Sequence, residues 1–394
     1  MGNFLADYTE FTSGNEANRN FHLWSALSAL SAIISRRVWI DLGYFNVHTN
    51  LYVVLVSPPG NKKTTAMNIA KGLVREVGDI PFSADCQTKE QLVKEWAEYE
   101  RVYKTPTDLI TYTPYAIFSG ELSQFLGPNS GHMIDFLTTV YDLPVYDLKT
   151  KNKGCQLILG PYISFIGCTT PDWITTYLKS DIISGGFSRR ALFINEPDDG
   201  ERITFPDITP EMQQAWERVV AYGKGLQTVG GQFRWDNVAK MFYHTWYQTH
   251  KIPDDPLVRG YFKTKHIQLL KVAMLLALSE GHDLVLKQTH IELGLELLGH
   301  TEKNLSAIFH GFGRNELFAV SSKILEFLSK YGKPIREAKL YDMFFREVDS
   351  REMFNILMHL EKSGKIVRAK ETTAGKEIIY VMTPEVAEKE VKKA

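Results

Sequence analysis

The sequence predicts an α/β fold in which a mostly parallel β-sheet is followed by a helical region and a small C-terminal domain. Three observations support this prediction. Continuous apolar runs of strand length, such as NLYVVLVS at 50–57, are typical of parallel strands that are covered on both faces. Segments with helical periodicity separate these runs, and such alternation favours an α/β layer. After Pro206 the pattern becomes almost wholly helical, and it changes again near residue 313.

The first expected element is a buried helix at 17–37, where large apolar side chains recur at helical spacing. A short β-like segment, RVWIDL, follows it. The further predicted strands are 109–119, 161–170 and 190–195, and the predicted helices between them are 64–77, 88–103 and 120–140.

The end of the chain has the pattern of three helices, which begin near residues 321, 336 and 350, and of a closing hairpin from IVRAK to EIIYVM. Three helices followed by a β-wing form the winged-helix arrangement, a variant of the helix-turn-helix. The expected parts of the chain are therefore an N-terminal helical segment at 1–45, a core at 46–205, a helical lid region at 206–312 and a winged-helix domain at 313–394.

Composition limits the possible partners. The 394 residues include 45 basic and 46 acidic side chains, so a nucleic-acid partner has to be met by a local basic patch rather than by the field of the whole molecule. The three cysteines, Cys86, Cys155 and Cys168, have neither metal-ligand spacing nor the pattern of a disulfide framework, which fits a reducing cytoplasm. The first twenty residues do not resemble a secretory signal, and the apolar run that ends at Arg36 is too short for a bilayer. We expect a cytoplasmic protein without a membrane partner.

The segment SPPGNKKT at 57–64 lies between a predicted strand and a predicted helix, as a nucleotide phosphate loop does. Lys63 and Thr64 fall where such a loop has its phosphate-binding lysine and its Mg²⁺-binding hydroxyl. Ser57 and Lys62 replace the two customary glycines, so Gly60 is expected to make the tight turn. The predicted ATP-binding residues are Ser57, Pro58, Pro59, Gly60, Asn61, Lys62, Lys63, Thr64 and Thr65. The alternative is a surface turn that carries solvated lysines.

Glu121 directly follows the apolar run YAIFSG, at the place where P-loop ATPases hold a carboxylate that orients the attacking water. Together with Thr64 it is the expected Mg²⁺ ligand. The aspartate that usually precedes this glutamate is replaced by Gly120, so Asp142 or Asp85 would have to supply the other carboxylate near the metal. The alternative for Glu121 is an exposed first-turn glutamate that the helix dipole favours.

Two further segments, later in the chain than Glu121, also carry residue types that a P-loop ATPase uses. Thr169 and Thr170 end a predicted strand, where a hydroxyl can sense the γ-phosphate, although threonines are also ordinary before a Pro-Asp turn. The segment GGFSRR presents Arg189 and Arg190, of which one would act in trans on a neighbour's nucleotide as an arginine finger. A pair of surface ion-pairing arginines is the alternative.

A basic hairpin is predicted at VYDLKTKNKGCQLILG, with Lys149, Lys151 and Lys153 near its tip. Lysine contacts to phosphate give affinity for DNA without sequence preference. The alternative is a solvated hairpin tip, where lysines are common without binding DNA. The winged-helix segment offers further cations for duplex DNA, but interleaved glutamates make a protein-binding role equally compatible. These cations are Arg351, Lys362, Lys365, Arg368 and Lys370. In the helical region, Lys263, Lys265 and Lys271 flank the most apolar helix, where a cation can read a γ-phosphate or a lysine can snorkel to the surface.

The segments FHLWSALSALSAIISRRVWI, NLYVVLVSPPGNKKTTAMNIA, FSGELSQFL, GCTTPDWI and GGFSRRALFI together resemble a family of P-loop proteins from phages, plasmids and integrated elements. That family is classified as a domain of unknown function and is often encoded beside primase-helicase genes. The resemblance covers roughly residues 17–300. More distantly, the layout is similar to AAA+ replicative helicases of the minichromosome-maintenance and superfamily-3 kind.

The resemblance implies an AAA+-like P-loop core that hydrolyses ATP with Mg²⁺, assembles as a homo-oligomeric ring, most often a hexamer, and moves on DNA during replication of a mobile element. It also implies that the lysine hairpin projects into the channel of the ring. An ATP-binding replication initiator or helicase loader, which binds DNA without unwinding it, is the second interpretation. A defence ATPase that senses foreign DNA is a third.

Overall fold

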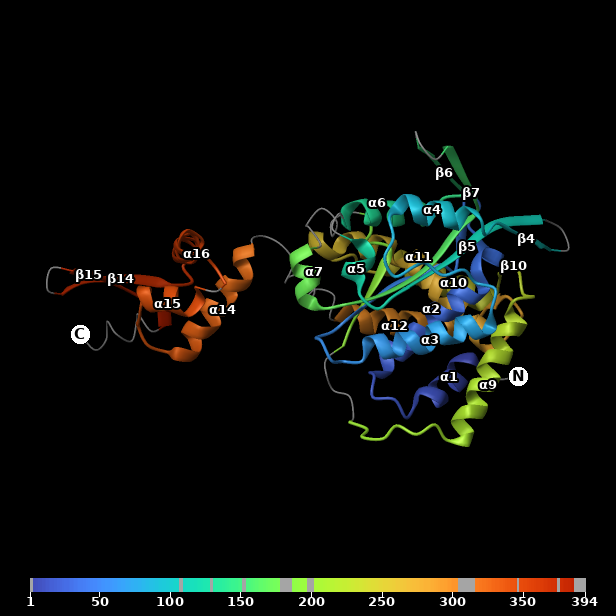
Figure 1. The fold of residues 1–394 in the computed structure, drawn as a ribbon, viewed down its shortest axis with the longest axis horizontal. Helices are drawn as coiled ribbons and strands as arrows, with labels where there is room; N and C mark the ends of the chain where they lie inside the picture. The colour runs from blue at the N-terminus through green and yellow to red at the C-terminus, as the bar shows by residue number, and fades with distance from the viewer. Residues whose placement is uncertain are drawn as a thin grey trace. The chain divides into compact units, whose positions relative to one another are not determined.

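The computed structural model describes residues 3–105, 109–127, 130–150, 154–177, 186–196, 202–303, 316–345, 347–373 and 376–385. The chain divides into two compact units, Met1–His310 and Gly311–Ala394 (Figure 1). None of the helices in the described ranges is long and apolar enough to cross a membrane.

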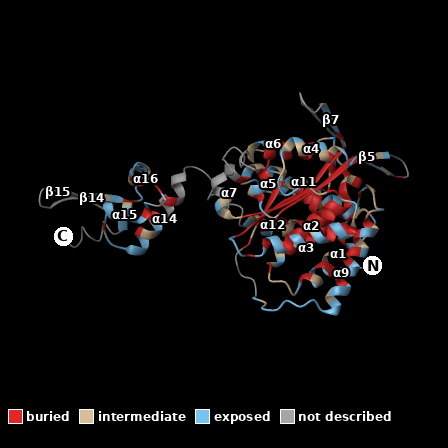
Figure 2. Cartoon of the chain, viewed as in Figure 1, coloured by how far each residue is buried: buried red, intermediate tan, exposed pale blue. Residues whose placement is uncertain are grey.

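A five-stranded sheet forms the centre of the first unit, in the order β4-β5-β8-β3-β9. The strands are β4 (Arg101–Lys104), β5 (Leu109–Ser119), β8 (Pro161–Thr169), β3 (Tyr52–Val56) and β9 (Ala191–Asn195). All neighbouring pairs are parallel except β4 with β5. Every residue of β3 and β8 is buried, because the sheet is covered on both faces (Figure 2). The predicted α/β fold is confirmed.

The register of the parallel strands aligns their carboxyl ends at one edge of the sheet. Val56 at the end of β3 lies opposite Thr169 of β8 and Asn195 of β9, and Ser119 of β5 lies opposite Gly167. In open α/β sheets this edge is where ligands bind. The loops that follow β3, β5 and β8 contain the predicted phosphate loop, Glu121 and Thr170.

Helix α2 (Arg19–Ile34) is buried along nearly its whole length (Figure 2). It packs against β8 and against α3 (Lys63–Val77), α9 (Pro210–Leu226) and α11 (Pro256–Glu280). Buried residues surround nearly the whole helix, so the buried helix predicted at 17–37 from the helical spacing of its large apolar side chains is confirmed. Helix α1 (Phe4–Thr12), which Asn3 caps, packs on α9 and was not predicted.

The structure corrects two predicted helical segments and adds a helix that was not predicted. The helix expected at 88–103 is α4 (Lys89–Ala97), and the chain then enters the edge strand β4. The segment 120–140 contains two helices, α5 (Leu122–Leu126) and α6 (Ser130–Val140), because Gly127 ends the first with a φ of 68°. A further helix, α7 (Pro171–Tyr177), follows β8.

The helical region also contains short strands. Between α9 and α10 (Asn237–Thr249), β10 (Gly231–Gln232) pairs with β1 (Val38–Asp41), whose other neighbour is β2 (Asn46–His48). Strand β11 (Arg234–Trp235) pairs with β12 (Val285–Leu286), which precedes α12 (Gln288–Lys303). The prediction of an almost wholly helical segment was therefore slightly too simple. The predicted lysine hairpin consists of β6 (Val145–Thr150) and β7 (Gly154–Leu159), which pair antiparallel.

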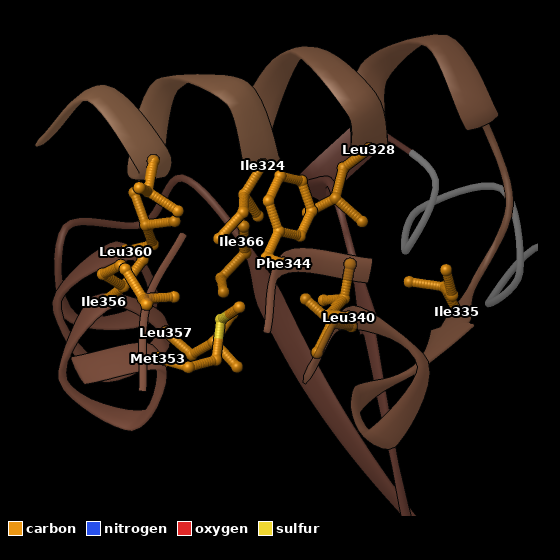
Figure 3. Packing of buried hydrophobic residues seen from close by; sticks show 13 residues of the cluster. Ile324, Leu328, Ile335, Leu340, Phe344, Met353, Ile356, Leu357, Leu360 and Ile366 are labelled. Carbon is orange, nitrogen blue, oxygen red and sulfur yellow. The ribbon is translucent and has the colours of Figure 1, made fainter. Parts of the chain in front are cut away.

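The second unit contains α14 (Glu316–Tyr331), α15 (Glu337–Phe344) and α16 (Ser350–Lys362) and an antiparallel sheet in the order β13-β15-β14. These strands are β13 (Ile335–Arg336), β14 (Val367–Thr373) and β15 (Lys376–Met382). Their apolar side chains enclose a core of their own around Ile324, Leu340 and Leu357 (Figure 3). Helix α16 begins with a capping box in which Asp349 and Glu352 exchange hydrogen bonds.

Candidate functional site

The loop between β3 and α3 is fixed to the sheet by side chains of its own. The amide of Asn61 donates a hydrogen bond to Ser57 Oγ, and Ser57 Oγ donates to the carbonyl of Glu196 at 3.1 Å. Both Ser57 and Asn61 are buried. The loop is thus held against the residue that directly follows β9, although Ser57 occupies the place of a customary glycine.

Two residues of this loop have left-handed backbone. Gly60 has a φ of 96°, which glycine adopts without steric cost. Lys62 has a φ of 54° and a ψ of 16°, although it carries a side chain. A phosphate loop has its second glycine at this position. The backbone of Lys62 has the left-handed conformation that a glycine would adopt there. Its ammonium lies 3.1 Å from Glu16 Oε2.

Lys63, the first residue of α3, folds its side chain back over the loop. Its ammonium donates hydrogen bonds of 2.7 and 2.9 Å to the carbonyls of Ser57 and Pro58. The residue is buried, and this burial lowers the pKa of the ammonium, whereas Cys168 and Glu121 act in the opposite direction. A cation is therefore held against the backbone of the loop.

A cavity of about 430 Å³ brings the predicted segments together at the carboxyl edge of the sheet. The loop, Glu121 and the end of β8 all contribute to its wall. Its lining residues are Pro59, Gly60, Lys62, Lys63, Thr64, Gly120, Glu121, Cys168, Thr169 and Thr170. Thr170 also caps α7, because its hydroxyl accepts a 3.3 Å hydrogen bond from the Trp173 N–H. Burial raises the pKa of the Cys168 thiol to about 12, so this thiol stays protonated in the floor of the cavity.

A second cavity of about 340 Å³ shares Thr64, Gly120 and Glu121 with the first and extends to Lys71 and Asp85. The segment around Phe82 pairs with Ala116 of β5, which carries Asp85 to this edge of the sheet. Lys71 Nζ lies 3.5 Å from the exposed Asp85 carboxylate.

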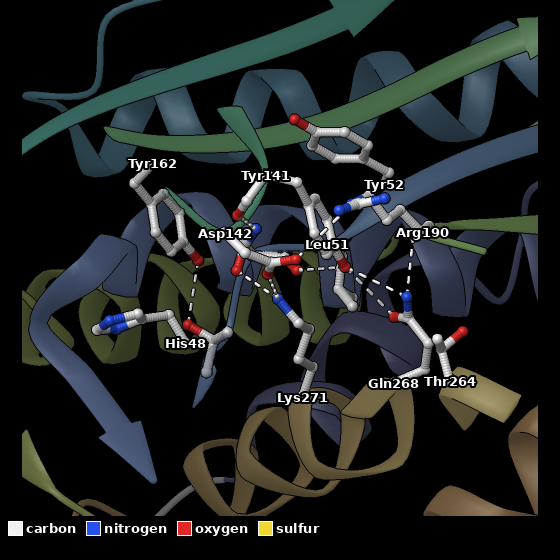
Figure 4. A network of polar contacts seen from close by, with 12 residues as sticks. His48, Leu51, Tyr52, Tyr141, Asp142, Tyr162, Arg190, Thr264, Gln268 and Lys271 are labelled. Carbon is white, nitrogen blue, oxygen red and sulfur yellow. Dashed lines mark hydrogen bonds and ion pairs between the residues drawn. The ribbon is translucent and has the colours of Figure 1, made fainter. Parts of the chain in front are cut away.

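The structure places the two carboxylates that were considered for the metal in different surroundings. Asp85 lines a cavity together with Thr64 and Glu121. Asp142 instead lies 3.7 Å from Arg190 and 3.8 Å from Lys271, in a network that includes Tyr52 at the amino end of β3 (Figure 4). Asp142 is thus not a residue of the candidate site.

In the described part of the chain, no group of three or more His, Cys, Asp or Glu residues is arranged to hold a metal ion. Mg²⁺ does not need such a group, because it keeps several waters and binds through one or two carboxylates and substrate phosphates. Thr64 and Glu121 in the wall that the two cavities share, together with Asp85 in the smaller cavity, fit that requirement. A Cβ at Gly120 would lie 3.2 Å from Thr64 Cγ2, so an aspartate at this position would crowd the threonine.

Arg189 and Arg190 precede β9 and therefore lie at its amino end, and neither lines the larger cavity. Arg190 donates a 3.0 Å hydrogen bond to the Gly186 carbonyl, and its guanidinium lies 5.6 Å from the ring centroid of Tyr141. With Asp142 beside it, Arg190 is held in place. The side chain of Arg189 is exposed, while its carbonyl accepts a 3.2 Å hydrogen bond from Gln268.

The lysines of the helical region also lie outside the cavity lining. Lys271 is fully buried at the centre of the network in Figure 4, where it donates a 2.6 Å hydrogen bond to Asn50 Oδ1 and lies 4.1 Å from the ring centroid of Tyr141. Burial lowers its pKa to about 8. The snorkelling interpretation of Lys271 is therefore wrong. Lys265 forms a 2.7 Å ion pair with Glu302, and Lys263 is exposed.

Of the three hairpin lysines, Lys149 lies on β6 opposite Cys155 of β7, and its side chain is 76% exposed. Asp147 is 3.8 Å away, which leaves most of the ammonium in solvent. Lys151 and Lys153 lie outside the described residues. In the second unit, Arg368 is bound to Glu337 at 2.6 Å and to Glu361 at 3.3 Å, so this predicted DNA contact is used inside its own unit.

Sequence reasoning missed Glu16, Lys71 and Glu196, although all three contact or line the candidate site. Glu16 accepts a hydrogen bond from the Ile203 N–H. This bond, and to a smaller extent the contact with Lys62, lowers the pKa of the Glu16 carboxyl. None of the three belongs to a short motif, and Glu16 and Glu196 are far from the loop in sequence. Lys71 alone had a signal, because it lies two helical turns after Lys63 on α3.

A comparison with models of known protein families finds no match to this chain, and a comparison with curated proteins finds none either.

Proposed function

We propose that this chain is a P-loop ATPase of the AAA+ type that uses ATP and Mg²⁺ to move along or unwind DNA during replication of a phage or another mobile element. One observation carries the proposal. The loop with Lys63 and Thr64, the glutamate after β5 and the threonine after β8 line one cavity at the carboxyl edge of a parallel sheet. They come from three separate segments of the chain, so a surface turn with solvated lysines does not account for their convergence.

The residues of the cavity have distinct chemical tasks in this proposal. Lys63 holds a positive charge against the β- and γ-phosphates, and the amides at the start of α3 donate to phosphate oxygens. Glu121 accepts a proton from, and thereby orients, the attacking water, and Thr170 donates to the γ-phosphate. Mg²⁺, when bound, supplies charge neutralisation between the phosphates, and Thr64, Glu121 and Asp85 are the residues that would hold it and its waters.

The arginine that completes the site comes from a neighbouring subunit. Because Arg189 and Arg190 lie at the opposite end of β9 from the cavity, neither serves the nucleotide of its own subunit. Arg189 is the better candidate of the two, since its side chain is exposed and Arg190 is held by Gly186, Tyr141 and Asp142. A ring of identical subunits, most often a hexamer, places such an arginine beside each site.

DNA binding is assigned to the β6–β7 hairpin and to the second unit. Lys149 is exposed, and together with Lys151 and Lys153, which follow it in the sequence, it gives contacts to the DNA backbone that do not depend on base sequence. We interpret the second unit as a winged helix, in which Arg351, Lys362 and Lys365 are the exposed cations near α16.

A second candidate function is an ATP-binding replication initiator or helicase loader. Lys62 in place of a glycine favours it, because a side chain at this position restricts how closely the backbone approaches a phosphate. A motor and a loader differ in turnover and in strand separation.

The test combines turnover with imaging. ATP hydrolysis is measured with and without single-stranded DNA, and negative-stain images are recorded with an ATP analogue and DNA. The proposal requires DNA-stimulated hydrolysis and rings. Nucleotide binding with weak, unstimulated turnover and no strand separation would instead support the loader, and the absence of nucleotide binding would refute both.

A further inference from the structure

Lys62 and Glu16 form an ion pair at the rim of the larger cavity. Lys62 Nζ lies 3.1 Å from Glu16 Oε2, and Lys62 itself lines the cavity beside Gly60, Lys63 and Thr64. The lysine side chain is 51% exposed, whereas that of the glutamate is 26% exposed. The pair therefore joins the loop to a residue of the segment that precedes α2.

Of the two partners, Glu16 is held by a second contact, whereas the side chain of Lys62 is half exposed. The second oxygen of Glu16 accepts a 2.8 Å hydrogen bond from the Ile203 N–H, which belongs to the chain after β9. The carboxylate is thus held from a side that does not involve the loop. A lysine ammonium sits on a flexible four-carbon stem and makes its contacts as a point charge, so it can exchange one anionic partner for another.

The backbone at Lys62 gives no reason for a lysine. A left-handed conformation favours glycine, and any Cβ is unfavourable there. The loop nevertheless has a long cationic side chain at this position, at the wall of a cavity whose other cation is Lys63. The presence of a lysine at position 62 is therefore explained by the contacts of its side chain and not by its backbone conformation.

We infer that Lys62 leaves Glu16 and contacts the phosphate chain when a polyphosphate enters the cavity, and that Glu16 limits how tightly this anion binds. The inference rests on the proposed function, because it assumes that the cavity takes a triphosphate. The carboxylate and the ligand compete for one ammonium. The observed affinity is consequently reduced by the fraction of molecules in which Lys62 remains with Glu16.

The experiment measures binding of a fluorescent ATP analogue, and its displacement by inorganic tripolyphosphate, for the full-length chain. The variants are Glu16→Gln, Lys62→Gln and the double variant. Glutamine keeps the acceptor for the Ile203 N–H but removes the charge. We expect Glu16→Gln to tighten binding of both probes about twofold to fivefold, as an exposed ion pair allows. Lys62→Gln should weaken binding, and Glu16→Gln should add no tightening in its background.

Glu10→Gln is the matched control. Glu10 pairs with Arg218 at 2.7 Å in the same N-terminal region and lines neither cavity, so its loss of charge should leave the affinity unchanged. Lys62→Gly, which suits the left-handed backbone, separates the loss of the ammonium from backbone strain and should weaken binding as Lys62→Gln does.

Three results would overturn the inference. They are an affinity that Glu16→Gln leaves unchanged or weakens, a tightening that persists when Lys62 is glutamine, and an equal tightening in Glu10→Gln. If the wild-type protein binds neither probe, the proposed function fails together with this inference. If it binds both and Glu16→Gln has no effect, the inference alone is wrong.

Discussion

Lys63 donates a 2.7 Å hydrogen bond from its ammonium to the backbone carbonyl of Ser57, six residues earlier in the chain. The lysine and the first residue of the loop are thereby joined across the turn, and the positive charge lies inside it. A phosphate that enters the loop would meet this ammonium directly, whereas a solvated surface lysine would point away.

Replacing Lys63 with alanine should therefore abolish nucleotide-dependent activity. A hydrogen bond to a charged group contributes about 1.5–3 kcal/mol, so affinity for a fluorescent ATP analogue should fall at least about tenfold. Lys94→Ala, at an exposed position of α4, is the control and should bind normally. Unchanged turnover in Lys63→Ala would remove this residue from the site.

Glu121→Gln should separate binding from hydrolysis. The amide keeps the shape of the side chain at the shared wall of the two cavities but cannot accept a proton from water. General-base catalysis contributes roughly 10²–10⁴-fold, so phosphate release should fall at least about 100-fold while the ATP analogue still binds. Glu98→Gln, an exposed carboxylate at the C-cap of α4, serves as the control. A variant that hydrolyses ATP normally would make Glu121 an ordinary helix-terminal residue.

Asp85 and Asp142 should respond differently to neutralisation. Asp85→Asn should raise the Mg²⁺ concentration needed for half-maximal turnover about tenfold, because carboxylates near a metal tune its affinity by such amounts. Binding of Mn²⁺ in the presence of an ATP analogue, followed by electron paramagnetic resonance, gives a readout that does not depend on turnover. Asp142→Asn should leave the Mg²⁺ requirement unchanged and lower thermal stability, since Arg190 and Lys271 share that carboxylate. The opposite pattern would place the metal near Asp142.

Removing the three hairpin charges with Lys149→Ala, Lys151→Ala and Lys153→Ala should weaken binding to single-stranded DNA. Each lost phosphate contact should also reduce the slope of log K against log salt by about 0.7. Fluorescence anisotropy over a range of salt concentrations measures both quantities. Lys240→Ala, an exposed lysine on α10, should change neither. If the slope stays the same in the triple variant, the hairpin does not hold the DNA.

Lys271 predicts a particular pH dependence of stability. Burial lowers its pKa from 10.5 to about 8, so below pH 8 the folded protein contains a buried charge that the unfolded chain exposes to water. This charge lowers the free energy of unfolding by about 3 kcal/mol, and the penalty disappears as pH rises from about 8 to 10.5. Wild type should therefore gain stability relative to Lys271→Met over that interval. Urea unfolding of both proteins at several pH values tests this, and a constant difference would contradict it.

Strands buried on both faces could be predicted from sequence because burial alone makes them uniformly apolar. This holds for β3, β5, β8 and β9. The edge strand β4 was taken for the end of a helix, since RVYK continues a charged segment and its pairing with β5 is not visible in the sequence. The two-residue strands β10, β11 and β12 are too short to produce any period.

For the site, residues in a motif were found and residues that reach it through tertiary structure were not. Lys63, Thr64 and Glu121 follow strand ends, and the sheet brings strand ends together. Glu16 reaches Lys62 only through the packing of the segment before α2. The choice between Asp85 and Asp142 likewise depended on the pairing of Phe82 with Ala116, which no local pattern encodes.

The distribution of the three thiols gives the protein two native labelling positions. Cys86 and Cys155 are exposed and Cys168 is buried, so a maleimide dye should react with the first two and leave the third unmodified. Cys86 adjoins Asp85 at the smaller cavity, and Cys155 faces Lys149 across the hairpin. Changing either exposed cysteine to serine would leave a single dye, either beside the cavity or on the hairpin, without any new cysteine being introduced.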